Sequence, residues 1–307
     1  MMRDEYTMKV MKFGGTSIGN GRRILHVAKI IRDYSEKDRV VIVVSAMSGV
    51  TDKLIDVFKM FQKGQHSEGL INLGQLYEKH VLALDEFGFR NGRYLMIQNN
   101  LKNLFGELLT YLSFRKNYSM MDFDHIVSYG ERWSCLLVAA SLQKLETMAE
   151  VVESYKLIVT SSEFGNAKVH LSDTEKKASK VILPLLIKGV IPIVTGFFGA
   201  TKEGKIATLG RGGSDYSATV LAYALSAQEV ILWKEVNGIF TSDPKNGNGA
   251  RYIPELSYEK AVKLAKAGAK VLHPEAMKPV ISKKIIVWVK NTFQPEFIGS
   301  KIWEGRK

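Results

Sequence analysis

Short apolar runs alternate with helical repeats along most of the chain. The clearest run is Arg39–Ser45 (RVVIVVS), which is apolar at successive positions, as expected of a strand buried on both faces. Runs of this kind predict strands at 9–13, 39–45, 150–153, 190–195, 229–233 and 285–289. Apolar residues three or four apart predict helices at 22–33, 132–144, 214–225 and 258–267. This alternation predicts an α/β fold with a largely parallel sheet covered by helices.

The stretch from about residue 51 to residue 118 has a different pattern. It contains several repeats of helical period, such as Leu101, Leu104 and Leu108, and no convincing strand. We predict a helical insertion between two segments of the sheet. A soft boundary near residues 183–189 divides the chain into a part of about 1–188, which includes this insertion, and a part of about 189–307.

Composition narrows the class of protein. Of 307 residues, 46% are hydrophobic and 24% are charged, which is typical of a globular chain and excludes collagenous and disordered classes. The one cysteine, Cys135, excludes an internal disulfide framework, and it lies in an apolar helical pattern typical of a buried residue. No His residues are spaced as metal ligands, so we predict no dedicated metal site. Neither a membrane span nor a signal peptide is visible, so we expect a cytoplasmic protein without a membrane partner.

The net charge of +12, from 43 Lys and Arg against 31 Asp and Glu, has several explanations. A solvated basic surface, sites for small anions and nucleic-acid binding all fit such an excess. The charges are interleaved with apolar residues rather than gathered in runs of five or six. Nucleic acid is therefore the least favoured partner.

The first motif with chemical content is Lys12-Phe13-Gly14-Gly15-Thr16-Ser17, between a predicted strand and a predicted helix. Two glycines let backbone N–H groups approach an anion, and the start of a helix favours negative charge. Lys12 adds a positive charge of the kind that binds phosphates. Neither a Walker A motif nor a dinucleotide fingerprint is present. A plain structural turn is the alternative interpretation.

A second glycine-rich segment, Gly210-Arg211-Gly212-Gly213-Ser214-Asp215, also leads into a predicted helix. A helix cap explains Ser214 or Asp215 but not an arginine beside three glycines. The guanidinium of Arg211 next to a flexible backbone fits a site that binds a carboxylate.

Two further motifs carry weaker signals. Glu131, in Ser128-Tyr129-Gly130-Glu131-Arg132, is either a first-turn carboxylate that favours the helix dipole or a ligand-binding group. Lys270 lies in Gly-Ala-Lys-Val-Leu-His-Pro, between a helix stop and a turn.

Together, and in this order, the motifs resemble the aspartate kinases of the amino-acid kinase superfamily. The matching segments are VMKFGGTSIGNGRRI, VIVVSAMSGVTDKL, VSYGERWSCLLVAA, GFFGATKEGKIATLGRGGSDYSATVLA, VNGIFTSDPK, GAKVLHPEAMKP and VKNTFQPE. They run from about Met8 to Ile302, and their ordered combination is far more specific than any one of them.

This resemblance implies an αβα three-layer sandwich with a mainly parallel central sheet. A lobe of about 1–188, including the insertion at 51–118, would bind the amino acid, and a lobe of about 189–307 would bind the nucleotide. The implied reaction moves the γ-phosphoryl group of ATP, with Mg²⁺, to the side-chain carboxylate of L-aspartate. The product, 4-phospho-L-aspartate, begins the biosynthesis of lysine, threonine and methionine, and family likeness suggests a homodimer.

The resemblance also implies roles for single residues. Lys12 and Asp215 would be catalytic. Lys12 would stabilise the β- and γ-phosphates in the transition state, and Asp215 would orient Lys12 and the substrate. Arg211 would hold the α-carboxylate of aspartate and Glu131 its ammonium group. The other substrate-binding positions are Ser45, Thr51 and Ser214, and the nucleotide-binding positions are Gly14, Gly15, Lys234, Glu235, Phe240, Asp243 and Lys270.

The chain departs from the family pattern at two places. It has Lys234-Glu235 where the family usually has a Thr-Asp pair that lies against the nucleoside. A lysine at this position can instead reach a phosphate. The kinase pattern ends near Ile302, and we expect no ACT regulatory domain in this chain, as in either a naturally short enzyme or a catalytic domain. Two other functions stay open: a kinase of this fold acting on another carboxylate, and a non-catalytic regulatory subunit.

Overall fold

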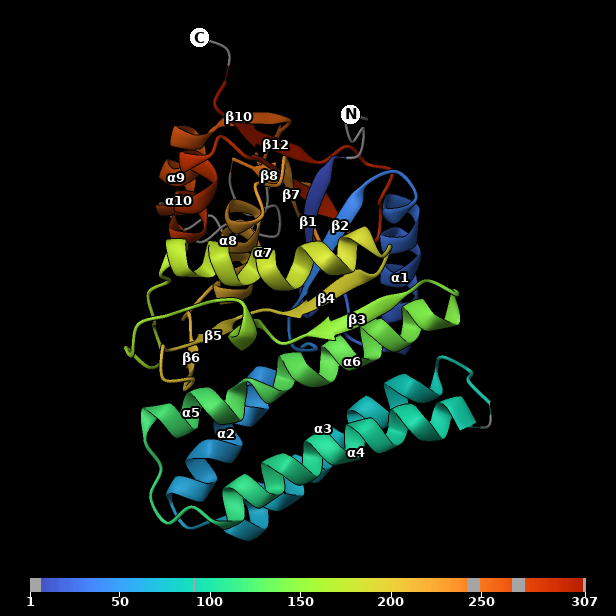
Figure 1. The fold of residues 1–307 in the computed structure, drawn as a ribbon, viewed down its shortest axis with the longest axis vertical. Coiled ribbons are helices and arrows are strands. Elements are labelled where there is room, and N and C mark those ends of the chain that lie inside the picture. Colours follow the sequence, from blue (N-terminus) through green and yellow to red (C-terminus); the bar gives the residue numbers. More distant parts are fainter. Residues whose placement is uncertain (1–6, 91, 242–248, 267–273, 306–307) are drawn as a thin grey trace.

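A computed structural model describes residues 7–90, 92–241, 249–266 and 274–305. A mainly parallel sheet runs through the middle of the molecule (Figure 1). Within the described residues it has eight strands, in the order β10-β12-β11-β7-β1-β2-β4-β3. All neighbouring strands are parallel except the pair β11 and β12. The predicted α/β class and its parallel sheet are confirmed.

The predicted strands lie in this sheet within a residue or two of their expected bounds. They are β1 (Met8–Phe13), β2 (Arg39–Val44), β3 (Ala149–Val152), β4 (Ile191–Thr195), β7 (Glu229–Lys234) and β11 (Ile286–Asn291). Every residue of β4 is buried, as are all but the first of β2, because helices cover both faces of the sheet there. The strands β10 (Glu255–Ser257) and β12 (Ser300–Trp303) were not predicted.

Helices α1 (Gly21–Ser35) and α6 (Tyr129–Lys144) pack on one face of the sheet. Helices α7 (Leu171–Ile187) and α8 (Gly213–Ala224) pack on the other face, with α10 (Pro274–Ser282) against α8 and α9 (Tyr258–Lys266) beside it. Helix α6 begins three residues before the expected position, and so it includes Glu131. Helix α7 was not predicted, and it ends at Ile187, within the soft boundary expected near residues 183–189.

The predicted helical insertion is confirmed. It contains α2 (Val50–Gln62), α3 (His66–Asp85) and α4 (Gly92–Ser113), followed by α5 (Met120–Val127). Figure 1 shows the α3–α4 pair as an outer layer beyond α6. Because β4 pairs with both β2 and β3, the two expected lobes share one sheet, and their division stays a prediction.

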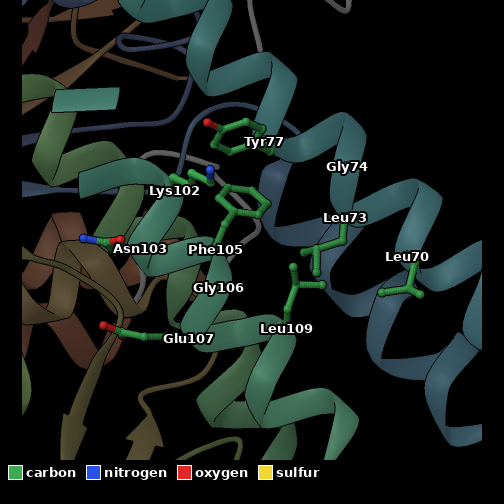
Figure 2. A pocket seen from close by; sticks show the side chains of 10 residues that line it. All are labelled: Leu70, Leu73, Gly74, Tyr77, Lys102, Asn103, Phe105, Gly106, Glu107 and Leu109. Carbon is green, nitrogen blue, oxygen red and sulfur yellow. The ribbon is translucent and has the colours of Figure 1, made fainter. Parts of the chain in front are cut away.

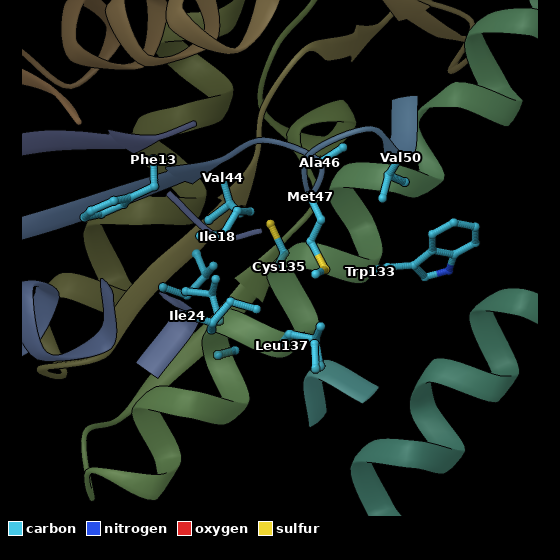
Figure 3. Close-up of a cluster of buried hydrophobic side chains, with 14 of the residues drawn as sticks. Phe13, Ile18, Ile24, Val44, Ala46, Met47, Val50, Trp133, Cys135 and Leu137 are labelled. Atoms are coloured by element: carbon cyan, nitrogen blue, oxygen red, sulfur yellow. The ribbon is translucent and has the colours of Figure 1, made fainter. Parts of the chain in front are cut away.

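One hydrophobic cluster joins the sheet to the insertion (Figure 3). Phe13 and Val44 come from the sheet, Val50 from α2, and Trp133 and Cys135 from α6. Cys135 is fully buried, as predicted, and burial raises the pKa of its thiol well above the usual range. This packing holds the starts of α2 and α6 against the ends of β1 and β2.

Small elements complete the fold. They are η1 (Ser154–Lys156), the hairpin of β5 (Phe198–Ala200) and β6 (Ile206–Thr208), and the pair β8 (Ile239–Phe240) and β9 (Tyr252–Ile253). No helix in the described ranges combines the length and the apolar character that crossing a bilayer requires.

Candidate active site

The carboxyl ends of three adjacent parallel strands meet at one edge of the sheet. Lys12 is the last residue but one of β1, Ser45 directly follows β2, and Lys234 ends β7. Ligands of open α/β sheets bind outside the carboxyl ends of the strands, so this edge is where a site is expected.

The turn after β1 packs against the turn after β2. A Cβ atom at Gly15 would lie 2.6 Å from the carbonyl oxygen of Ala46, so only glycine allows this approach. At Gly14 a Cβ atom would lie 3.6 Å from Lys12 Nζ, which is ordinary contact. The Gly14 N–H donates a long hydrogen bond of 3.4 Å to the carbonyl of Trp233. The two predicted glycines therefore lie beside Lys12 and β7.

The second glycine-rich segment turns the chain sharply into α8. Gly210 and Gly212 have φ values of 74° and 73°, a left-handed conformation that side chains rarely adopt. The turn leaves Arg211 exposed and buries Ser214 and Asp215 in the first helical turn. A Cβ atom at Gly213 would lie 2.8 Å from the Phe197 ring, so the structure accounts for all three glycines.

Asp215 pairs with two lysines from the sheet. Its Oδ1 lies 2.6 Å from Lys12 Nζ, and its Oδ2 accepts a hydrogen bond of 2.9 Å from Lys234 Nζ. Burial by itself would raise the pKa of Asp215, but the two ammonium groups outweigh it and hold this pKa well below the usual range. The aspartate is therefore ionised at neutral pH and fixes both cations.

Glu131 is buried at the start of α6. Its Oε1 accepts a hydrogen bond of 3.0 Å from the backbone N–H of Ala46, and its Oε2 has no partner among the described residues. Burial raises the pKa of Glu131 to about 8, although the Ala46 N–H and the charge of Lys12 act in the opposite direction. An unpartnered carboxyl oxygen in this position is suited to bind a cationic group of a ligand.

These groups line one cavity of about 450 Å³. Ser45 and Ser214 meet across it, with 2.8 Å between their hydroxyl oxygens. Every predicted catalytic and substrate-binding residue lines the cavity: Lys12, Ser45, Thr51, Glu131, Arg211, Ser214 and Asp215. The sequence motifs therefore meet in space.

Four of the predicted nucleotide-binding residues, Gly14, Gly15, Lys234 and Glu235, lie where β1 and β7 end. Lys234 reaches Asp215, whereas Glu235, the next residue, is exposed. Phe240 is half-buried in β8, with its ring 5.9 Å from that of Tyr252. Asp243 and Lys270 lie outside the described residues.

Some residues of the cavity were not predicted. Asp52, Ile55, Phe123, Gly165, Phe197 and Thr208 also line it. The buried Asp124 supports it from behind, because its carboxylate accepts hydrogen bonds from the Thr208 N–H and hydroxyl and from the Gly165 N–H. Asp52 directly follows Thr51 in a segment that matches the family, so the sequence motif could have indicated it. Asp124 was not, because its partners are 41 and 84 residues away in the sequence.

A larger cavity, of about 890 Å³, lies between α3 and α4 (Figure 2). Its walls are mostly apolar, from residues such as Leu73, Tyr77, Phe105 and Leu109. Its charged lining residues are Lys102 and Glu107, both on α4, whereas several charged groups from different elements converge in the smaller cavity, which is therefore the candidate active site. In the part of the chain that the structure describes, no three His, Cys, Asp or Glu side chains gather as metal ligands.

Known proteins resemble the chain along nearly its whole length. "Aspartokinase 3, chloroplastic" of Arabidopsis thaliana is 35% identical over 97% of this chain, and the matched part is 53% of that protein. "Lysine-sensitive aspartokinase 3" of Escherichia coli is 31% identical over 95% of this chain and 63% of its own length. The chain therefore spans about half to two thirds of the length of these relatives.

Solved structures show the same likeness. The structure of E. coli aspartokinase III in complex with aspartate and ADP has a TM-score of 0.86 and 31% identity, over 98% of this chain and 65% of that one. A UMP kinase from Bacillus anthracis shares the fold alone, with a TM-score of 0.54 and 17% identity. The model of the amino acid kinase family matches residues 7–291. This match covers the sheet except β12, the insertion and every described residue of the candidate site, and the chain belongs to the amino acid kinase family.

Proposed function

We propose that this chain transfers the γ-phosphoryl group of MgATP to the side-chain carboxylate of L-aspartate, giving 4-phospho-L-aspartate. The observation that carries the proposal is the cavity in which Lys12, Glu131, Arg211 and Asp215 meet. Support also comes from the relatives, which are aspartokinases, one of them solved with aspartate and ADP. The proposal includes a place at the start of lysine, threonine and methionine biosynthesis, a cytoplasmic location and a homodimer.

The groups in the cavity suit a reaction between two anions. A carboxylate with a pKa near 3.9 is already ionised at neutral pH, so the acceptor needs no catalytic base. The main barrier is the repulsion between the carboxylate and the phosphates, and fixed positive charges lower it. Lys12 and Lys234, held by Asp215, supply such charges at the ends of β1 and β7.

Separate groups would bind the two ends of the amino acid. Exposed Arg211 can hold the α-carboxylate through its planar guanidinium. Glu131, with its unpartnered oxygen, would take the ammonium group. The hydroxyls of Ser45, Thr51 and Ser214 would then contact the substrate between these two charges.

The nucleotide would bind beside the glycine turn after β1. In this proposal Gly14 and Gly15 donate backbone N–H groups to phosphate oxygens, and Gly14 gives up its long hydrogen bond to the Trp233 carbonyl. Lys234, Glu235 and Phe240 flank the nucleotide, as do Asp243 and Lys270. Mg²⁺ would arrive with the nucleotide, since its phosphates supply the hard oxygen ligands this ion prefers. It would neutralise part of the phosphate charge during transfer.

A hydroxamate assay tests the function, because hydroxylamine traps an acyl phosphate as it forms. With MgATP we expect L-aspartate to give product well above L-glutamate and other carboxylic acids. A different preferred acceptor would instead indicate a kinase for another carboxylate. No product with any acceptor, from folded protein that also fails to bind MgATP in calorimetry, would indicate a non-catalytic subunit.

A further inference from the structure

A second cavity, of about 290 Å³, lies next to the candidate active site. Met121 and His125, on one face of α5, contribute to it, whereas Phe123, on the opposite face, lines the substrate cavity. Its polar wall is formed by Tyr111, Arg115, His125, Arg132, Tyr155 and Lys205. The wall therefore carries three cationic side chains and no carboxylate, which is the composition expected of a site for an anion.

The two arginines are held in fixed orientations. Arg132 Nε lies 2.8 Å from Glu153 Oε2, and its guanidinium lies over the rings of Tyr129 and Tyr155, 4.7 and 5.8 Å from their centroids. Arg132 is itself only 8% exposed. A guanidinium fixed along its Nε edge and across its face loses little freedom when its remaining N–H groups bind an oxyanion.

Arg115 is held in the same way. Its Nε lies 3.2 Å from Asp122 Oδ1, its guanidinium lies 4.5 Å from the centroid of the Tyr111 ring, and one terminal nitrogen donates to the Tyr111 hydroxyl. Glu153 and Asp122, the carboxylates that hold the two arginines, do not line the cavity. The positive ends of both ion pairs therefore face it.

Lys205 and His125 complete the polar wall. Lys205 is exposed and makes no ion pair with any residue that the structure describes. Burial, together with the charges of Arg132 and Arg115, lowers the pKa of His125 to about 4. The imidazole is therefore neutral at pH 7 and adds a hydrogen-bonding group without competing with an anion's charge.

The second cavity and the substrate cavity share their walls. In α6, Arg132 lines one and Glu131 the other. In β6, Ile206 lines the second cavity and Thr208 the substrate cavity. Asp124, beside His125 in α5, holds Thr208 and Gly165 by hydrogen bonds. A ligand that shifts α5 or β6 would therefore move groups that line the substrate cavity.

We propose that this second cavity binds a small organic anion carrying carboxylate or phosphate groups, and that its occupancy changes the affinity of the neighbouring cavity for the amino-acid substrate. The cavity is too small for a nucleotide but large enough for a compact metabolite. The binding part stands by itself, and only the effect on the substrate rests on the proposed kinase function.

Calorimetry with two probes tests the binding. Citrate and inorganic phosphate are titrated separately into the wild type, into the double variant Arg115→Gln/Lys205→Gln, and into Lys202→Gln. Lys202 lies in the same turn, pairs with Asp173 at 3.5 Å and is outside the cavity, so it controls for the loss of one surface charge. We expect at least one probe to bind at least tenfold more weakly to the double variant and within twofold of wild type to Lys202→Gln. The probe that binds tells carboxylate from phosphate recognition.

Equal affinities in the wild type and the double variant, or no binding of either probe to folded wild type, would overturn the site. If the double variant does not fold, Lys205→Gln alone replaces it, since this side chain is exposed, and a loss of at least threefold is expected.

The effect on the substrate has its own readout. In the wild type the bound probe should change the KM for L-aspartate at least threefold, and in the double variant it should not. An unchanged KM with the probe bound would overturn the coupling. Binding without any kinase activity would instead contradict the proposed function and leave the site standing.

Discussion

Asp215 organises the charges of the candidate site. With one carboxylate it holds two ammonium groups, Lys12 and Lys234, within 3 Å of its oxygens. These three side chains together carry one net positive charge, and they are in place before any phosphate enters. Such groups need little reorganisation during transfer, which is the main source of electrostatic catalysis.

Replacing Lys12 tests this arrangement. Lys12→Ala should lower kcat more than tenfold, a change of at least about 1.4 kcal/mol in the activation barrier, because it removes the positive charge that we propose stabilises the transferring phosphate. Steady-state kinetics with MgATP and L-aspartate measures it. Lys9→Ala is the matched control on the same strand, since Lys9 pairs with Asp38 outside the cavity and kcat should stay within twofold. A loss below tenfold in Lys12→Ala would contradict the catalytic role.

Replacing Lys234 tests whether this side chain acts on nucleotide binding and not on amino-acid binding. We expect Lys234→Met to raise the KM for MgATP at least fivefold and to leave the KM for L-aspartate within twofold, because Lys234 ends β7 beside the glycine turn. The variant keeps the Lys12–Asp215 pair. Equal changes in both KM values would show that Lys234 acts on the whole site through Asp215 and not on the nucleotide.

The raised pKa of Glu131 predicts that substrate binding releases a proton. Its pKa of about 8 leaves it mostly protonated at pH 7, whereas an ammonium group beside it favours the charged form. Binding of L-aspartate at pH 7 should therefore release close to one proton. Calorimetry in buffers of different ionisation enthalpy measures this number, and Glu131→Gln should abolish the release. A release that is unchanged in Glu131→Gln would contradict the assignment.

The same residue makes the stability of the free protein depend on pH. The folded state keeps the Glu131 proton up to about pH 8, and the unfolded state loses it near pH 4.5. The folded state therefore binds more protons in this window, so the contribution of Glu131 to the free energy of unfolding falls as the pH rises through it. Urea unfolding of wild type and Glu131→Gln at pH 5 and pH 8 should show a steeper fall in the wild type. Parallel curves would contradict the raised pKa.

At the scale of elements, the site depends on how closely two turns pack. The turn after β1 touches the turn after β2 at Gly15, where a Cβ atom would lie 2.6 Å from the Ala46 oxygen. The neighbouring N–H of Ala46 is the donor to Glu131. The glycine therefore keeps β1, β2 and α6 in the register that forms the cavity.

This packing predicts different costs at neighbouring glycines. Gly15→Ala should lower the free energy of unfolding by about 1–3 kcal/mol, because backbone atoms must move to admit the new methyl group. Gly14→Ala should change it by no more than about 0.5 kcal/mol, since its Cβ meets only the end of a flexible side chain and one carbonyl at ordinary distances. Urea unfolding compares the two, and equal losses would contradict the close approach.

Sequence patterns predicted some elements of the whole molecule and missed others for physical reasons. The central strands were predictable because burial on both faces makes them continuously apolar, as in Arg39–Val44. Strands of two or three residues, such as Ile239–Phe240, are too short for any periodicity to show. Helix α7 was missed because its buried stripe is sparse, with Thr174, Ala178 and Ile182 inside, and Pro184 near its end.

The candidate site was predictable where local chemistry marks it. Glycines beside Lys12 and Arg211 are visible in the sequence, and the resemblance to aspartate kinases implies that both segments belong to one site. The pair of Lys234 with Asp215 was not visible, because it depends on the parallel register of β1 and β7 beside α8. Only the folded sheet brings these side chains together.

The position of the new phosphate bond is the most direct test of the central claim, transfer to the side-chain carboxylate of aspartate. Hydroxylamine is added during turnover with MgATP and L-aspartate, and chromatography with mass spectrometry compares the product with authentic α- and β-aspartyl hydroxamates. Because Arg211 and Glu131 would hold the α-carboxylate and the ammonium group, only the β-hydroxamate should form. The α-hydroxamate, or no hydroxamate from folded protein that binds both substrates, would contradict the account.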